Sequence, residues 1–352
     1  MQTELLQEAR RQAEICNACR YCEGFCSVFP ALHRERAFSD GDLTQLANLC
    51  HNCRGCYYAC QYTDPHEFGL NLPAALAEVR HDSWDSYAWP APAARAFHRN
   101  GGMIALAAVL GFALLFAIAR FAGNAGGGTG YYAVLSHNLM VAIFAPAFLL
   151  PLLSLAVSLR RYWTAVGGGR ISLSHITEAF GSAARMTNLA AGHGEGCNFE
   201  DEDRFSQGRR HVHQAVMYGF LLCFASTSSA TVLHYVFAMS APYGFFSLPK
   251  LLGVPGGILL TLGCIGMAVL KLKADKSLGD PSAWGGEMAF VLLLGFVGFS
   301  GLALYALGST ALMPLILALH LGAVLTFFLL TPFTKMAHGF YRLTALIREA
   351  QN

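Results

Sequence analysis

Six apolar stretches, each about as long as a bilayer-crossing helix, constrain the fold of this chain more than any other feature. They lie near residues 103–122, 133–159, 212–239, 252–270, 288–307 and 311–331. An α-helix needs roughly 20 apolar residues to cross a bilayer. Charged residues make up only 13% of the chain, against about 25% in soluble proteins. The sequence therefore predicts a six-helix transmembrane bundle, and a large soluble helical core is the alternative.

Basic residues gather in alternate connections between the apolar stretches. Seven arginines lie between Arg160 and Arg210, after the second stretch, and Lys271 and Lys273 follow the fourth. Cytoplasmic connections of membrane proteins carry an excess of lysine and arginine. We therefore expect a multi-pass protein of a bacterial inner membrane, with both chain ends in the cytoplasm.

The N-terminal part, residues 1–80, is polar and shows no alternating strand pattern. Helices are predicted at Gln2–Ile15 and Ser39–Leu49, the second capped by Ser39 or Asp40. The remaining divisions are a linker at 81–102, a transmembrane part at 103–340 with a cytoplasmic loop at 160–210, and a cytoplasmic tail at 341–352. The predicted fold class is therefore all-α.

Eight of the 11 cysteines form two runs with identical spacing. The runs are Cys16-x2-Cys19-x2-Cys22-x3-Cys26 and Cys50-x2-Cys53-x2-Cys56-x3-Cys60. In two-cluster ferredoxins, three closely spaced cysteines bind one cluster and the fourth cysteine of the run binds the other. The spacing therefore predicts two [4Fe–4S] clusters. Their ligands are Cys16, Cys19, Cys22 and Cys60 for one cluster, and Cys50, Cys53, Cys56 and Cys26 for the other.

The two runs differ from those of bacterial ferredoxins, in which proline follows the fourth cysteine. Ser27 and Gln61 occupy those positions here, and 23 residues separate Cys26 from Cys50. That separation suits a helical connection, so we expect an α-helical ferredoxin domain. Zinc sites prefer paired Cys-x2-Cys segments, and triple runs suit them poorly. Two structural zinc ions, or a [3Fe–4S] centre at one position, are the alternatives.

Histidines in or beside the apolar stretches form a second candidate site, because ionisable residues inside a membrane are costly and usually functional. His213 and His234 are 21 residues apart, and His320 and His338 are 18 apart. These separations correspond to about 31 Å and about 27 Å of helix. In the predicted topology His213 and His338 share the cytoplasmic side, and His234 and His320 share the other. This predicts one or two bis-histidine b-type haems, with His137 as an alternative outer ligand or quinone-site residue.

Other histidines and cysteines are weaker candidates for cofactor binding. His211 is a poorer candidate than His213 for the haem ligand on the cytoplasmic side, since it lies about 140° around the helix from His234. Each membrane histidine is alternatively an interfacial or hydrogen-bonded core residue. The polar stretch Gly192–Phe205 contains His193 and Cys197, and it either docks a partner, covers a cluster or is a solvated loop.

No feature of the sequence points to a substrate-transforming site. Paired carboxylates, a Ser-His-Asp order and a phosphate-binding loop do not stand out. The sequence therefore predicts an electron-transfer subunit of an oxidoreductase, not a stand-alone enzyme, and no nucleic-acid partner.

Seven stretches together carry a family resemblance. They are CNACRYCEGFCSVFPA (16–31), NLCHNCRGCYYACQY (48–62), YAWP (87–90), GCNFEDEDRFSQGRRHVHQAVMYGFLLCFAST (196–227), HY (234–235), HLG (320–322) and KMAHGFYR (335–342). The chain resembles the tricarballylate/citrate utilisation protein B family over nearly its whole length. The resemblance implies a soluble FAD-dependent partner, tricarballylate dehydrogenase or a related enzyme. Its reduced flavin would be reoxidised through the clusters, and the electrons would pass to the membrane quinone.

Each half of the chain also resembles known electron-transfer subunits. The cysteine domain is similar to the α-helical ferredoxins of succinate dehydrogenase and heterodisulfide reductase. The membrane part is similar to nitrate-reductase gamma-type cytochrome b subunits, which implies haem at the four paired histidines. Two rival functions are electron transfer from quinol to a soluble reductase, and a haem-free membrane protein with a redox-sensing iron–sulfur domain.

Overall fold

The computed structural model describes residues 2–121, 130–200 and 203–352, and nearly all of the secondary structure in these ranges is helical. The only extended pairing within them is an isolated antiparallel bridge between Cys197 and Ser206. The all-α prediction is therefore confirmed.

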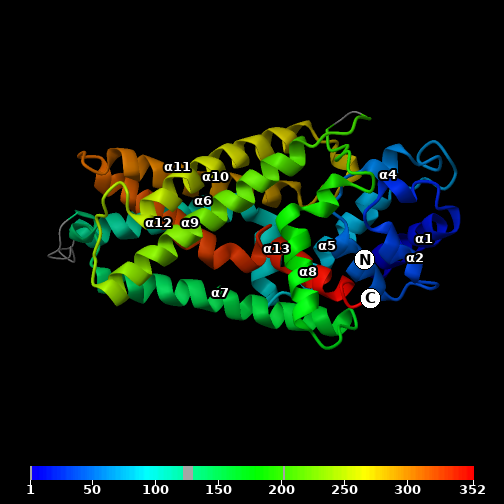
Figure 1. The fold of residues 1–352 in the computed structure, drawn as a ribbon, viewed down its shortest axis with the longest axis horizontal. Helices are drawn as coiled ribbons and strands as arrows, with labels where there is room; N and C mark the ends of the chain where they lie inside the picture. Colours follow the sequence, from blue (N-terminus) through cyan, green and yellow to red (C-terminus); the bar gives the residue numbers. More distant parts are fainter. Residues whose placement is uncertain (1, 122–129, 201–202) are drawn as a thin grey trace.

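Six long helices form the apolar part of the molecule (Figure 1). They are α6 (Ala91–Phe121), α7 (His137–Ala165), α9 (Gly208–Phe237), α10 (Leu248–Lys273), α11 (Trp284–Leu307) and α12 (Met313–Leu330). By length and composition, six segments of the described residues could each cross a membrane. The six predicted spans are therefore confirmed as membrane-length helices.

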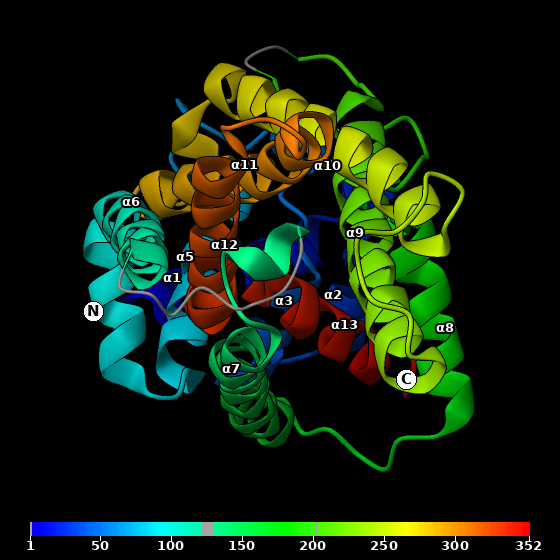
Figure 2. The same ribbon diagram turned by 90° about the vertical axis from the view of Figure 1, so that its left-hand side faces the viewer.

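The long helices run along the long axis of the molecule and surround α12. Viewed from the end, α12 lies between α6, α11 and α7, and α9 packs along α10 (Figure 2). Many large apolar side chains point outward, among them Leu114, Leu149 and Leu262, which are 60%, 60% and 63% exposed. An apolar surface of this extent is compatible with a multi-pass membrane protein.

Shorter elements at one end of the molecule form the cysteine domain. They are α1 (Gln2–Cys19), η1 (Glu23–Phe25), α2 (Phe29–Arg34), α3 (Asp40–Leu49), α4 (Gly55–Tyr58) and α5 (Leu72–Tyr87). Ser39 caps α3 as predicted: its hydroxyl accepts from the backbone N–H of Asp42, and the Asp42 carboxylate accepts from the N–H of Ser39. This reciprocal capping box satisfies two N–H groups at the start of the helix.

The segment 81–102, predicted to be a linker, is mostly helical. Helix α5 continues to Tyr87 and α6 begins at Ala91, with a break only at residues 88–90. Pro92 lies in the first turn of α6, where a helix tolerates proline because its N–H would be unpaired anyway. Asn100 interrupts α6 with non-helical angles (φ −139°, ψ 29°), so the chain bends just before the membrane span.

The C-terminal segment is a docked helix, whereas the sequence predicted a tail at 341–352. Helix α13 (Ala337–Glu349) buries Tyr341 and Ala345, which are 2% and 0% exposed. The carbonyl of Ala345 accepts a hydrogen bond from Gln45 at 2.8 Å, and Arg34 forms an ion pair with Glu349 at 2.5 Å. These contacts join the cysteine domain to the membrane part in one continuous core.

The connection 160–210 is also structured. It contains the last turn of α7, helix α8 (Leu173–Arg185) and the short η3 (Thr187–Ala190). The remaining short helices are η2 (Gly130–Ala133), η4 (Lys276–Leu278) and η5 (Thr331–Phe333). Both chain ends lie at the cysteine-domain end of the molecule (Figure 1).

Candidate functional site

The first cysteine pocket lies where α1 ends. Cys16 and Cys19 occupy the last turn of α1, and Arg20 then adopts a left-handed backbone (φ 57°) that turns the chain toward Cys22. These three cysteines line one pocket together with Cys60, from the end of the second run. The first three cysteines of one run and the last cysteine of the other are therefore brought together.

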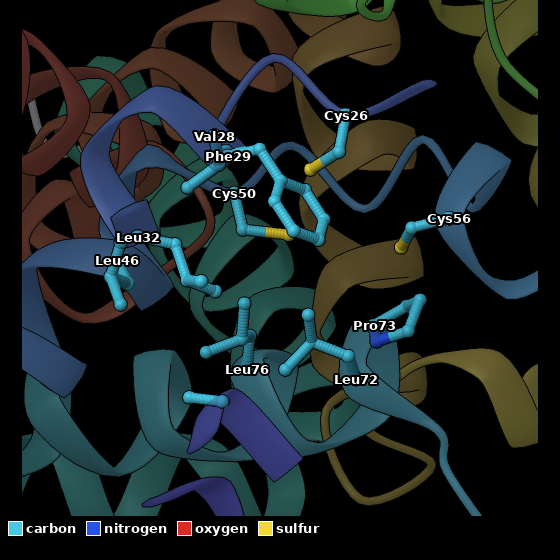
Figure 3. Close-up of a pocket in the computed structure, with 11 residues that line it drawn as sticks. Cys26, Val28, Phe29, Leu32, Leu46, Cys50, Cys56, Leu72, Pro73 and Leu76 are labelled. Atoms are coloured by element: carbon cyan, nitrogen blue, oxygen red, sulfur yellow. The ribbon is translucent and has the colours of Figure 1, made fainter. Parts of the chain in front are cut away.

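The second cysteine pocket lies deeper, between α2, α3 and α5. Cys50 and Cys56 line it together with Cys26, from the end of the first run. Figure 3 shows the three side chains around one space, closed by apolar residues such as Phe29 and Leu72. The two pockets thus exchange their fourth cysteines, which is the arrangement expected of a two-cluster ferredoxin.

Cys53 lies beside the second pocket without lining it. It packs in a small buried cluster with Leu189 and Cys197. Burial, then the charge of Cys197, and then those of Cys26 and Cys50 raise the pKa of the Cys53 thiol. Cys53 is therefore near its three predicted co-ligands, and Cys197 lies in the same buried cluster.

The connection after α8 covers this part of the cysteine domain; we call residues 186–200 and 203–206 the covering loop. Its Asn198 N–H donates to the carbonyl of Cys53 at 2.8 Å, and its Gly192 N–H donates to the carbonyl of Phe25 at 3.3 Å. Phe205 stacks on Phe25 with ring centroids 5.9 Å apart. Of the roles considered for Gly192–Phe205, the geometry favours covering a cofactor site.

The electrostatics of both pockets favour a bound cation. Burial, followed by the charges of Cys60 and Cys26, raises the pKa of the Cys22 thiol to about 12. The hydrogen bond that the Cys56 thiol donates to Cys26, followed by burial, raises the pKa of Cys56. Thiolates are the form that binds metals, so several of them can ionise here together only if positive charge enters the pocket.

The side chains in the described ranges do not form a site for a single metal ion. Within the described ranges, no group of three or more His, Cys, Asp or Glu side chains is close enough to bind one metal ion. An iron–sulfur cubane is larger than a single ion, so its thiolates lie farther apart. The alternative of two structural zinc ions gains no support from this geometry.

Three arginines surround the start of the second cysteine run, residues 50–52. Arg80 and Arg342 donate to the carbonyl of Cys50 at 3.0 and 2.9 Å. Arg209 donates to the next two carbonyls at 2.9 and 2.8 Å. No carboxylate of the described residues pairs with any of the three. Burial, and then the charge of Arg80, lower the pKa of Arg342 well below its usual range, whereas the charges of Cys50 and Glu287 act in the opposite direction.

His213 and His338, which we call the inner histidine pair, lie close to these arginines. The rings of His213, on α9, and His338, in the first turn of α13, have centroids 5.8 Å apart and planes at 87°. Two imidazoles that share one metal through bonds of about 2 Å hold their centroids roughly 6 Å apart. Nδ1 of His338 donates to the backbone carbonyl of Lys335, and Nδ1 of His213 is buried without a hydrogen-bond partner. The two rings therefore leave room for a metal that both histidines would hold.

The outer histidines are arranged differently from the predicted pairing. The ring of His234 lies against that of His137, with centroids 4.1 Å apart, and the Nε2 of His137 is 3.0 Å from the hydroxyl of Tyr235. His320 instead contacts the hydroxyl of Ser300 at 3.0 Å. Among the described contacts, none joins His234 to His320. A 4.1 Å stack leaves no room for a metal between the rings.

Several site residues are not evident from sequence patterns. Arg209 and Arg342 lie in two of the stretches that carry the family resemblance, yet nothing in those stretches indicates contact with residues 50–52. His51 was also missed; it lies between Cys50 and Asn52, and the charges of His213 and His338 act on it. His51 is thus near both the arginines and the two histidines whose charges act on it.

The fold and the two pockets define the class: a helical protein with six membrane-length segments and a ferredoxin-like cysteine domain packed on one end. A family model described as "Citrate utilization protein B Fer4-like domain" matches residues 9–86, and one described as "Citrate utilization protein B" matches residues 91–352. The chain is 40% identical over 358 residues to Citrate utilization protein B of Escherichia coli, which covers 99% of this chain and 93% of that protein.

The chain therefore belongs to the citrate utilization protein B family, which confirms the predicted resemblance. The match of the Fer4-like model also supports iron–sulfur binding by the cysteine domain. No solved structure matches the chain.

Proposed function

We propose that this protein is a membrane-bound electron carrier. It accepts electrons from the reduced FAD of a soluble dehydrogenase similar to tricarballylate dehydrogenase and passes them to the membrane quinone. The observation that carries the proposal is the exchange of fourth cysteines: Cys60 lies in the first pocket and Cys26 in the second. The name of the related protein, which refers to citrate utilization, supports a tricarboxylate as the substrate of the partner enzyme.

The two pockets fit two [4Fe–4S] clusters. Such clusters carry one electron at a time, and they would divide the electron pair of a reduced flavin into single steps. The protein contributes thiolates, burial and spacing. The left-handed Arg20 directs Cys22 back toward Cys16 and Cys19, and the covering loop excludes water from the region of Cys53.

The inner histidine pair fits one b-type haem, with His213 and His338 as its axial ligands. A haem there would carry electrons into the membrane part. The carbonyl of Lys335 holds the His338 ring through Nδ1, which leaves Nε2 for the metal, as is usual for ligating histidines. His137, His234 and His320 do not form a second site of this kind, so one haem per chain is the better-supported number.

The basic residues support a cytoplasmic location of the cysteine domain. Arg160 and Arg161 lie just before the last turn of α7, Arg209 and Arg210 begin α9, and the lysines at 271 and 273 end α10. These helix ends are at the same end of the molecule as α1 and α3 (Figure 1). An excess of lysine and arginine at one end of a bundle places that end in the cytoplasm, where a soluble flavoprotein would meet it.

Iron, haem and the optical spectrum of the detergent-purified protein test this proposal. We expect about eight non-haem irons per chain, and about one haem with sharp b-type bands in the dithionite-reduced minus oxidised spectrum. Reduced flavoprotein added to membranes that contain the protein should reduce the quinone. Iron without haem would restrict the proposal to the clusters, and protein without iron would refute it.

A further inference from the structure

The two cysteine pockets differ in their exposure to solvent. Tyr21, on the rim of the first pocket, is 67% exposed, and Gln61 on the same rim is also exposed. The second pocket lies between helices, and the covering loop packs over the neighbouring Cys53. A soluble partner can therefore approach the first pocket closely, whereas the second faces the membrane part.

The pockets also differ in the positive charge around them. The arginine on the rim of the first pocket, Arg20, is exposed and donates to the carbonyl of Asn17 at 2.9 Å. The second pocket has the three arginines that donate to the carbonyls of residues 50–52, and Arg80 is only 6% exposed. A buried charge acts more strongly than an exposed one, because less water screens it.

These arginines are placed to act on a redox group. Reduction adds negative charge to a cluster, so nearby positive charge that is not neutralised favours the reduced form and raises the potential. Within the described part of the chain, Arg80, Arg209 and Arg342 form no ion pair with a carboxylate. The Glu287 carboxylate, whose charge acts on Arg342, is itself paired with Lys271 and Lys335. The guanidinium N–H groups of the three arginines donate to the carbonyls of residues 50–52, the segment that begins with Cys50. These hydrogen bonds hold the positive charges close to the second pocket.

Building on the proposed function, we propose that Arg80, Arg209 and Arg342 hold the second cluster at a higher reduction potential than the first. Electrons would therefore enter at the exposed first pocket, which contains Cys16, and pass to the second pocket, which faces the membrane part. A reduced flavin loses two electrons and releases its proton to water; the electrons move one at a time from the first cluster to the second. This gradient favours transfer from flavin to quinone over the reverse direction.

The test is a redox titration of the purified full-length protein followed by electron paramagnetic resonance, with both clusters loaded. In the wild type, the signal that is lost in Cys53→Ser identifies the second cluster, and we expect it to have the higher midpoint potential. In Arg342→Gln that midpoint should fall while the other is unchanged. Arg342→Lys, which keeps the charge, should restore most of the wild-type value.

Arg160→Gln is the matched control, because Arg160 is an exposed arginine at the end of α7, and it should leave both midpoints unchanged. Iron content reports whether each variant folds and holds its clusters; if Arg342→Gln loses iron, the same titration is made on Arg209→Gln. Equal midpoints in the wild type, or no shift in iron-replete variants of both Arg342 and Arg209, would overturn the inference. Absence of iron from the wild type would instead refute the proposed function.

Discussion

Replacing Cys53 with serine is expected to remove one cluster and to stop electron transfer to quinone. Cys53 is the remaining ligand candidate for the pocket of Cys26, Cys50 and Cys56. Losing one of four thiolates would lower the iron content from about eight to about four per chain. Flavin-to-quinone electron transfer in membranes should fall to the background rate, because the second cluster would no longer connect the first pocket with His213 and His338.

Cys197→Ser is the matched control for this change. Cys197 is in the same buried cluster as Cys53, but its thiol donates to the carbonyl of Leu189 at 3.3 Å. A serine hydroxyl can make the same bond, so iron content and transfer should remain near wild type. If Cys197→Ser loses the cluster and Cys53→Ser keeps it, the fourth ligand comes from the covering loop and the assignment of Cys53 is wrong.

Replacing His213 with alanine is expected to remove the haem while both clusters remain. The 5.8 Å separation from His338 is the only histidine pairing described here that leaves space for a metal between two rings. The alanine variant should lose the b-type bands of the reduced minus oxidised spectrum, and its iron–sulfur signals should be unchanged. Quinone reduction should fall at least about tenfold, which corresponds to a barrier about 1.4 kcal/mol higher for electron transfer without the haem.

His211→Ala is the control, since His211 is on the same helix and is exposed. It should keep the haem bands and the quinone reductase rate. A full haem content in His213→Ala, or its loss in His137→Ala, would show that the haem is held at the outer end of α9.

Sequence patterns predict the parts of this protein that depend on local periodicity and spacing. Apolar length predicts the six membrane helices, because a helix in lipid must satisfy its own backbone hydrogen bonds over the full thickness of the bilayer. The Ser39 cap of α3 follows from one side chain and its neighbours in the chain. The grouping of Cys60 with the first run and Cys26 with the second follows from a spacing that only a few cluster geometries can satisfy.

Sequence patterns did not predict the helices in two segments, 81–102 and 341–352. There, residues that favour a helix lie beside prolines, glycines or polar residues that suggest irregular chain. The prolines and glycines of 81–102 suggest a linker, but proline is tolerated in the first turn of a helix, and α6 includes both Gly101 and Gly102. The segment 341–352 resembles a polar tail, yet a single apolar stripe containing Tyr341 and Ala345 is enough to dock it as α13.

What the sequence by itself determined is therefore the class: an all-helical protein with a two-run cysteine domain and six membrane-length helices. Only the tertiary structure decided which distant residues meet. It brought Arg342 and Arg209 to the carbonyls of residues 50–52, and it paired His234 with His137 instead of His320. The physical reason is that spacing along a helix predicts depth and face, whereas contact between helices depends on how their surfaces pack against one another.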